Sequence, residues 1–154
     1  MTKNKNILLC GVGNILMTDE GIGVHLINEI EKQNIVPENV EIMDGGTLGF
    51  ALIPYFCNRE KLIIVDAVKV KGEEGELYRF CPDNIKESKA TPISFHDLGI
   101  LDVIRTMKMQ DANVPKEIVI FGINVRNMDL GTELTETIKN KIEVYIKEIL
   151  KELV

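Results

Sequence analysis

Short apolar runs alternate with amphipathic segments along this chain, and no other feature constrains its fold as strongly. Each of four runs stops at a glycine or an aspartate, which is typical of strands buried on both faces of a parallel sheet. Between the first two runs, apolar residues recur at helical spacing over residues 21–33. Strands that alternate with helices predict a mostly parallel sheet with helices on both faces. The four runs cover residues 7–10, 40–43, 62–65 and 118–121.

Further segments complete the predicted fold. Residues 48–56 predict a short helix, and residues 76–80 alternate polar and apolar side chains after a connection too short for a crossover helix, which predicts an antiparallel edge strand. Residues 94–97 have capping-box spacing and predict a helix to about Met107. A long amphipathic helix is predicted from Thr132 onward.

Connection rules then fix the expected topology. Right-handed crossovers and short connections favour the strand order 2-1-3, with the later strands added beyond the third. We therefore expect one α/β domain over residues 1–154. Its architecture should be a three-layer α/β/α sandwich, in which a mostly parallel, doubly wound sheet carries one antiparallel edge strand.

Composition excludes several classes of function. The chain has 24 acidic and 18 basic residues and a net charge of −6, which disfavours binding to nucleic acid. The apolar stretch before Gly11 is too short for a signal peptide or a membrane span. Cys10, Cys57 and Cys81 are widely spaced without a C-x-x-C pair, so we expect reduced thiols. These features predict a cytoplasmic protein with no membrane partner, and we expect a monomer.

Acidic residues and a histidine follow the predicted strands at one edge of the sheet. In doubly wound sheets, ligands bind at the carboxyl ends of the strands, where the connections diverge. Glu20 lies in the loop after the first strand, Asp66 follows the third, and His96 stands at the start of a predicted helix, whose dipole favours the neutral imidazole. Carboxylates brought together there need a proton or a cation between them. Glu20, Asp66 and His96 therefore predict a catalytic divalent-metal site.

The acidic residues also have a structural interpretation. Asp19 or Glu20 could serve simply to stabilise the start of a helix, and Asp66 could serve simply to cap a turn. Asp44 before two glycines indicates a turn that lies close to the cleft. His25, the second histidine, is expected on the solvent side of its helix, without a metal role.

Two rival binding sites fit the residues less well. A dinucleotide fingerprint needs a third glycine at position 16, where Leu16 stands, and the chain has no P-loop. A phospho-receiver module also places acidic residues after the first and third strands. That module expects a lysine after the last strand, where Asn124 stands instead. Nucleotide binding is therefore not expected.

Four linked segments together resemble the [NiFe]-hydrogenase maturation endopeptidases. They occur in the family's order and with compatible spacing over residues 7–107, and more loosely to the C-terminal helix. The resemblance departs after the last strand, where residues 124–131 lack a proline that many relatives have, so the outer cleft and the choice of precursor are less defined. The four segments are GVGNILMTDEGIG at 11–23, DGGT at 44–47, LIIVD at 62–66 and ISFHDLG at 93–99.

The resemblance implies an endopeptidase that removes a C-terminal extension from the hydrogenase large-subunit precursor after nickel insertion. It implies that Glu20, Asp66 and His96 bind the metal: nickel carried by the precursor, or another divalent ion such as zinc or cadmium. Catalysis would then use a metal-polarised carbonyl or a metal-bound water, with a carboxylate as base. A nucleophilic serine or cysteine fits less well, because Ser94 lacks a second histidine partner. A non-catalytic nickel-sensing checkpoint or chaperone for the large subunit is the alternative.

Overall fold

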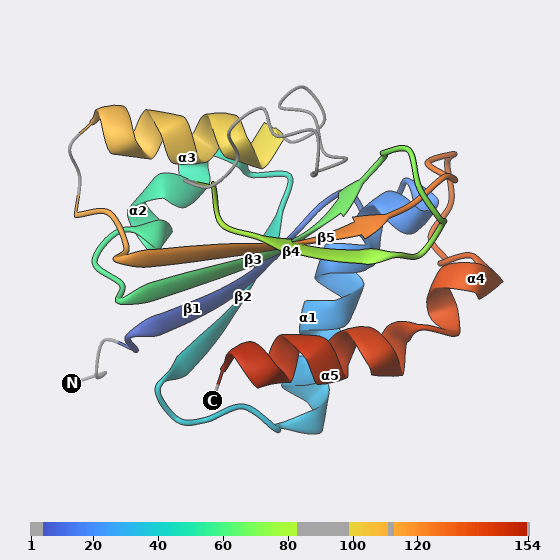
Figure 1. The fold of residues 1–154 in the computed structure, drawn as a ribbon, viewed down its shortest axis with the longest axis horizontal. Helices are drawn as coiled ribbons and strands as arrows, with labels where there is room; N and C mark the ends of the chain where they lie inside the picture. Colours follow the sequence, from blue (N-terminus) through green and yellow to red (C-terminus); the bar gives the residue numbers. More distant parts are fainter. Residues whose placement is uncertain (1–4, 83–98, 111–112, 154) are drawn as a thin grey trace.

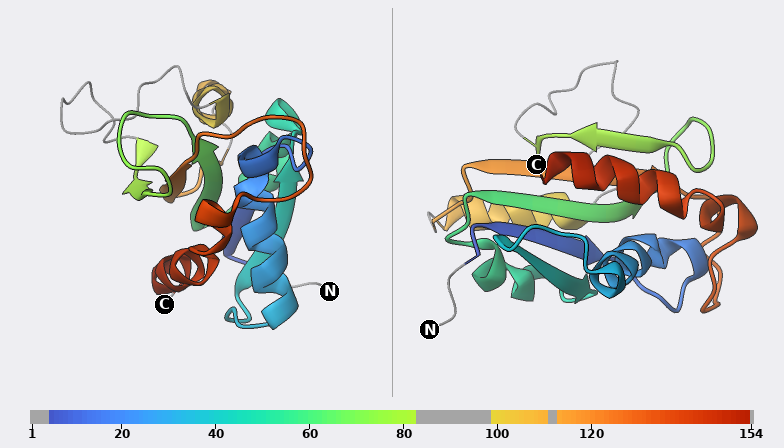
Figure 2. Two further views of the ribbon diagram at one scale, coloured as in Figure 1. Left: turned by 90° about the vertical axis from the view of Figure 1, so that its right-hand side faces the viewer. Right: turned by 90° about the horizontal axis from the view of Figure 1, so that it is seen from below.

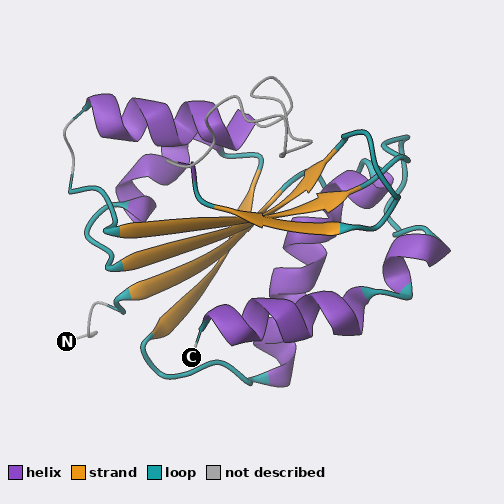
Figure 3. Ribbon diagram, viewed as in Figure 1, coloured by secondary structure: helices purple, strands orange, loops and turns teal. Residues whose placement is uncertain are grey.

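A five-stranded sheet forms the centre of the computed structural model, which describes residues 5–82, 99–110 and 113–153. The strand order is β2-β1-β3-β5-β4, and only β4 runs antiparallel to its neighbour (Figures 1 and 3). This order confirms the predicted 2-1-3 arrangement and the antiparallel edge strand. The strands are β1 (Ile7–Val12), β2 (Val40–Gly46), β3 (Lys61–Val68), β4 (Leu77–Phe80) and β5 (Glu117–Asn124).

Helices cover both faces of the sheet, which confirms the three-layer sandwich. On one face, Leu8 and Ile64 pack with α2 (Ile53–Phe56) and α3 (Gly99–Met109). On the other face, Leu9 and Ile63 pack with a second layer of helices. Figure 2 shows helices on both sides of the sheet. Alternate strand residues thus enter different cores, as the pleat requires. The opposite layer is formed by α1 (Ile22–Gln33), α4 (Glu136–Lys139) and α5 (Ile142–Glu152), and short 3₁₀ turns, η1 (Thr18–Gly21) and η2 (Gly49–Leu52), precede α1 and α2.

Glycines let the first turn of α1 lie directly against the sheet. A Cβ at Gly11 would lie 2.2 Å from the Gly23 carbonyl oxygen, and a Cβ at Gly23 would lie 2.2 Å from the Val65 carbonyl oxygen. No other residue type fits such a close approach of two backbones. Residues that precede α1 are therefore fixed beside the carboxyl ends of β1 and β3.

The C-terminal helix differs from its prediction. We expected one helix from Thr132, whereas helix begins at Glu136 and is interrupted at Asn140 and Lys141. Before the helix, Thr135 is extended and bound to the buried side chain of Asp19. At the break, the Lys141 N–H donates to the Ile138 carbonyl, one residue short of the α-helical spacing. Tertiary contacts therefore overrode the helical periodicity here.

Two other predictions need correction or lie outside the description. Asp66 was expected to end its strand, but β3 continues to Val68 because β5 remains paired with it. The capping-box residues 94–97 lie outside the described residues, although the helix behind them is present as α3. Among the described residues, no helix is long and apolar enough to cross a membrane.

An ion-pair network attaches α5 to the sheet. The Glu152 carboxylate accepts from Lys61 Nζ at 2.8 Å and from Arg79 Nε at 2.7 Å, and its side chain is only 13% exposed. The hydrogen bond from Arg79 and the two positive charges lower the pKa of Glu152 to about 2. A carboxyl whose pKa is lowered on folding stabilises the fold above its ordinary pKa.

We predict that Glu152→Gln lowers the free energy of unfolding by about 2 kcal/mol at pH 7. The loss should shrink as the pH falls from the ordinary value of 4.5 toward 2, because wild-type Glu152 then becomes neutral as well. Urea unfolding at several pH values measures it. Glu148→Gln is the control, because Glu148 pairs with Lys151 at the exposed surface and should contribute less than about 0.5 kcal/mol. Equal losses in both variants at pH 7 would contradict the prediction.

Candidate active site at the carboxyl edge of the sheet

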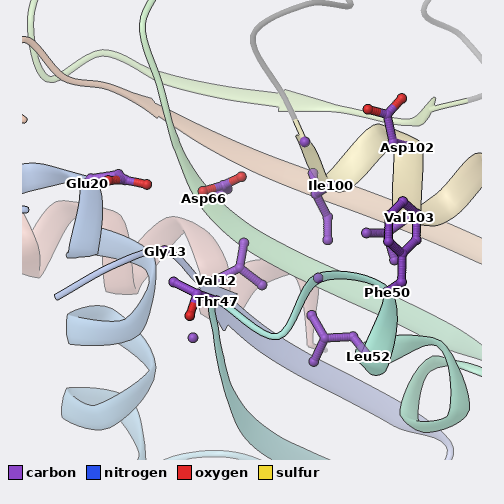
Figure 4. A pocket seen from close by; sticks show the side chains of 13 residues that line it. Val12, Gly13, Glu20, Thr47, Phe50, Leu52, Asp66, Ile100, Asp102 and Val103 are labelled. Carbon is purple, nitrogen blue, oxygen red and sulfur yellow. The ribbon is translucent and has the colours of Figure 1, made fainter.

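A cleft of about 390 Å³ opens at the carboxyl edge of the sheet, between β1, β2, β3 and α3. Its walls come from segments far apart in the sequence, which meet where the connections of β1 and β3 diverge. Figure 4 shows Glu20 and Asp66 on one side of this cleft and Phe50, Asp102 and Val103 on the other. The cleft therefore lies where ligands were predicted to bind.

Glu20 reaches the cleft from the 3₁₀ turn η1. Its N–H donates to the Met17 carbonyl, and its side chain is partly exposed and extends toward Asp66 (Figure 4). Asp19, the neighbouring acid, is fully buried and accepts hydrogen bonds from Thr135 N and Oγ1 at 2.8 and 2.7 Å. The structure thus separates the two acids: Glu20 faces the cleft, and Asp19 holds the C-terminal segment.

Asp66 enters the cleft from β3, one residue beyond the last β1 pairing at Val65. Burial, together with the charge of the Glu20 carboxylate, raises the pKa of Asp66 to about 7, although a hydrogen bond from the Ala67 N–H opposes the shift. The raised pKa shows that a second negative charge beside Glu20 is unfavourable without a counter-charge. The two carboxylates thus form a site that favours a proton or a cation.

The other predicted residues have different outcomes. His96 lies outside the described residues. Asp44 was expected in a turn, but it and the two glycines lie within β2, which continues to Gly46; its side chain accepts from the Gly46 N–H at 3.0 Å and lines a second hollow beside the cleft. Among the described residues, no group of three or more potential ligands could hold a metal ion. Of the three predicted ligands, Glu20 and Asp66 are among the described residues, and both line the cleft.

The prediction for His25 is only partly correct. Its side chain is partly exposed, but the Nε2 atom is buried and has no hydrogen-bond partner among the described residues. Burial lowers its pKa. His25 and Glu29 line a hollow together with residues 132–134 after β5, so this side of α1 faces that segment across the hollow.

Sequence reasoning missed the apolar wall of the cleft. Phe50 is 58% exposed and lies at the cleft beside Ile100, and Leu48 in the same segment is also exposed. Ile15 and Leu16 line the second hollow with exposed side chains. The available signal was the placement of large apolar residues next to the glycine-rich turns 11–13 and 45–46. Exposed apolar side chains around an acidic cleft indicate a peptide or protein ligand.

We predict that Asp66→Asn stabilises the protein by about 4 kcal/mol at pH 8, because each unit that the pKa rises on folding corresponds to about 1.4 kcal/mol. Because the pKa of this carboxyl rises from 3.8 to about 7 on folding, the folded protein loses stability as the pH increases through that range. The gain should therefore shrink toward pH 4, and urea unfolding between pH 4 and 8 measures it. A variant less stable than wild type at pH 8 would show that the charged form is favoured.

Comparisons with known proteins agree with the fold and identify the family. A family model described as hydrogenase maturation protease matches residues 24–152. The hydrogenase 2 maturation protease of Escherichia coli K12 is 36% identical over 148 residues, which are 96% of this chain and 90% of that protein.

Solved structures give the same result. The hydrogenase maturating endopeptidase HybD from Escherichia coli superposes with a TM-score of 0.80 at 35% identity, covering 96% of this chain and 91% of that one. The [NiFe] hydrogenase maturation protease HybD from Thermococcus kodakarensis gives 0.75 at 27% identity, covering 96% and 99%. These matches confirm the resemblance of the four sequence segments. The chain belongs to the hydrogenase maturation proteases, a family of endopeptidases and therefore of hydrolases.

Proposed function

We propose that this protein removes a C-terminal extension from a [NiFe]-hydrogenase large-subunit precursor, and that it recognises nickel already inserted in that precursor. The observation that carries the proposal is the convergence of Glu20 and Asp66 in one cleft, in a chain that matches maturation proteases along most of its length. His96 is the proposed third ligand, from the sequence resemblance. In this proposal, the cleft binds the nickel ion of the precursor and the scissile peptide next to each other.

The chemistry of the two carboxylates fits a cation. Burial and the Glu20 charge raise the pKa of Asp66, so the doubly charged pair is unfavourable by itself. A divalent ion supplies the missing positive charge and, when bound, acts as a Lewis acid on a peptide carbonyl. Nickel in the precursor is the proposed ion, and zinc or cadmium are further divalent ions for the same oxygen and nitrogen ligands.

The residues of the cleft can also move the proton that hydrolysis requires. Breaking a peptide bond adds hydroxide from water to the carbonyl carbon and a proton to the leaving nitrogen. A carboxylate beside the scissile carbonyl can accept the proton from the attacking water and pass it to that nitrogen, as a general base does. Asp66 Oδ2 is the proposed proton acceptor, since Oδ1 already accepts from the Ala67 N–H. Glu20 and the cleft walls would position the peptide.

The rim of the cleft fits a protein substrate. Exposed apolar side chains from two loops, among them Leu16 and Phe50, flank the carboxylates. Such a rim can hold the chain on both sides of a scissile bond. A nickel-sensing checkpoint or chaperone would use the same contacts without cleavage, and the release of a peptide distinguishes the two activities.

We predict that Glu20→Gln, Asp66→Asn and His96→Ala each weaken nickel binding at least tenfold, because each removes one proposed ligand. Calorimetric titration with nickel measures this. Asp102→Asn is a matched control, since Asp102 lines the far wall of the same cleft, is exposed and pairs with Arg105 at 3.5 Å. His25→Ala is a second control. Wild-type affinity in the His96 variant would remove that residue from the site.

We also predict that chelator-stripped enzyme remains folded and cleaves only nickel-loaded precursor. A partly open site of two carboxylates and one imidazole lacks the closed shell of a structural metal, so folding should not need one. Circular dichroism reports folding, and mass spectrometry detects the released C-terminal peptide. Equal cleavage of nickel-loaded and nickel-free precursor would contradict nickel recognition. Binding of the precursor without any released peptide would favour the checkpoint.

A further inference from the structure

The loop that carries Glu20 is hydrogen-bonded to a segment more than 100 residues later in the chain. Thr18 N donates to the Gly131 carbonyl at 2.9 Å, Gly131 N donates to the Leu16 carbonyl at 2.9 Å, and Asp19 N donates to the Asn127 carbonyl at 3.1 Å. Residues 127–135 thus support residues 16–19 along their length. We name these contacts, together with the side-chain bonds of Thr18 and Asp19, the clamp.

Thr18 holds an unfavourable backbone conformation within this clamp. Its φ is +52°, in the left-handed region that β-branched residues avoid, and it is only 8% exposed. Such a conformation persists only where the surroundings fix it. Its Oγ1 donates to the Asp129 carbonyl at 2.6 Å, and a Cβ at Gly131 would lie 2.9 Å from that Oγ1. The hydrogen bond to Asp129 and the lack of a side chain at Gly131 therefore hold Thr18 in this conformation.

Asp19 forms the second half of the clamp. Its carboxylate is fully buried, and both of its oxygens accept hydrogen bonds from Thr135, the residue that precedes α4. Burying a carboxylate is costly unless its oxygens are hydrogen-bonded. The pairing fixes the loop relative to a helix whose Ile138 is buried in the core.

The main chain of Glu20 is held between the clamp and the turn after β1. Its N–H bonds to the Met17 carbonyl, and its own carbonyl lies so close to Gly13 that a Cβ there would be 2.2 Å away. The direction in which the Glu20 side chain leaves the backbone is thereby set by neighbours on both sides. Release of Thr18 or Asp19 frees one of those sides.

We propose that Thr18 and Asp19 are positioning residues, which fix the turn η1 against residues 127–135 and thereby hold the Glu20 carboxylate opposite Asp66 in the cleft. Neither side chain lines the cleft, so both act through Glu20. This inference rests on the proposed function for its consequence in catalysis, but its structural content concerns the order of η1 alone.

Thr18→Gly is the decisive variant. Glycine tolerates the left-handed conformation, so the strain disappears while the hydroxyl bond to Asp129 is lost. We expect an unfolding midpoint close to that of wild type, because relief of the strain offsets the lost hydrogen bond and the greater chain entropy of glycine in the unfolded state. Hydrogen exchange at the Glu20 N–H should be at least tenfold faster. Nickel affinity and kcat for the nickel-loaded precursor should each fall about tenfold. A residue with only a structural role would not lower activity while stability is retained.

Conservative variants serve as rescue controls. Thr18→Ser keeps the hydroxyl, and Asp19→Asn keeps both contacts, because its amide can donate to the Thr135 hydroxyl while its oxygen accepts from Thr135 N. Both should retain at least half of the wild-type kcat. Asp19→Ala removes both contacts and should resemble Thr18→Gly in exchange and activity.

The measurements separate this inference from the proposed function. Wild-type nickel affinity and kcat in Thr18→Gly would overturn the positioning role, and so would unchanged exchange of the Glu20 N–H. If wild-type protein neither binds nickel nor cleaves the precursor, the proposed function fails. The exchange rate alone then decides: faster exchange in Thr18→Gly with rescue in Thr18→Ser supports the clamp, and equal rates overturn it.

Discussion

The close contact between the first turn of α1 and the sheet determines much of this structure. It depends on two glycines, since a side chain at Gly11 or Gly23 would overlap a backbone carbonyl. Because α1 begins so close to β1 and β3, the chain before it must turn within a few residues at the carboxyl edge of the sheet. That turn places Glu20 beside Asp66. A backbone packing requirement in the fold thus also creates the acidic cleft.

The cleft combines two chemical environments. One side carries carboxylates whose mutual repulsion and burial raise the pKa of Asp66, and the other carries exposed apolar side chains such as Phe50. The first environment favours a cation, and the second favours a polypeptide. The proposed substrate, a protein that carries a metal ion, fits both environments.

Sequence patterns predicted the sheet well because strand order follows from connection rules and buried runs. They failed where an element's end depends on a distant neighbour. Asp66 stays within β3 because β5 continues beside it, and the helix expected from Thr132 starts late because Asp19 binds Thr135. For the site, Glu20 and Asp66 followed from their places after strands, whereas the apolar wall at Phe50 required the packing of η2 against α3. Periodicity carries no information about such contacts.

Contacts between the loop of Glu20 and residues 127–135 also set an order of events during synthesis. Glu20 is translated early, but Asn127, Asp129, Gly131 and Thr135, which support its loop, are translated more than 100 residues later. A growing chain can form β1, β2 and β3 before these partners exist, with its acidic cleft only partly built. The carboxyl edge of the sheet therefore acquires its final shape only after residue 135 has been translated, and a nascent chain that stops before this point lacks the complete acidic cleft.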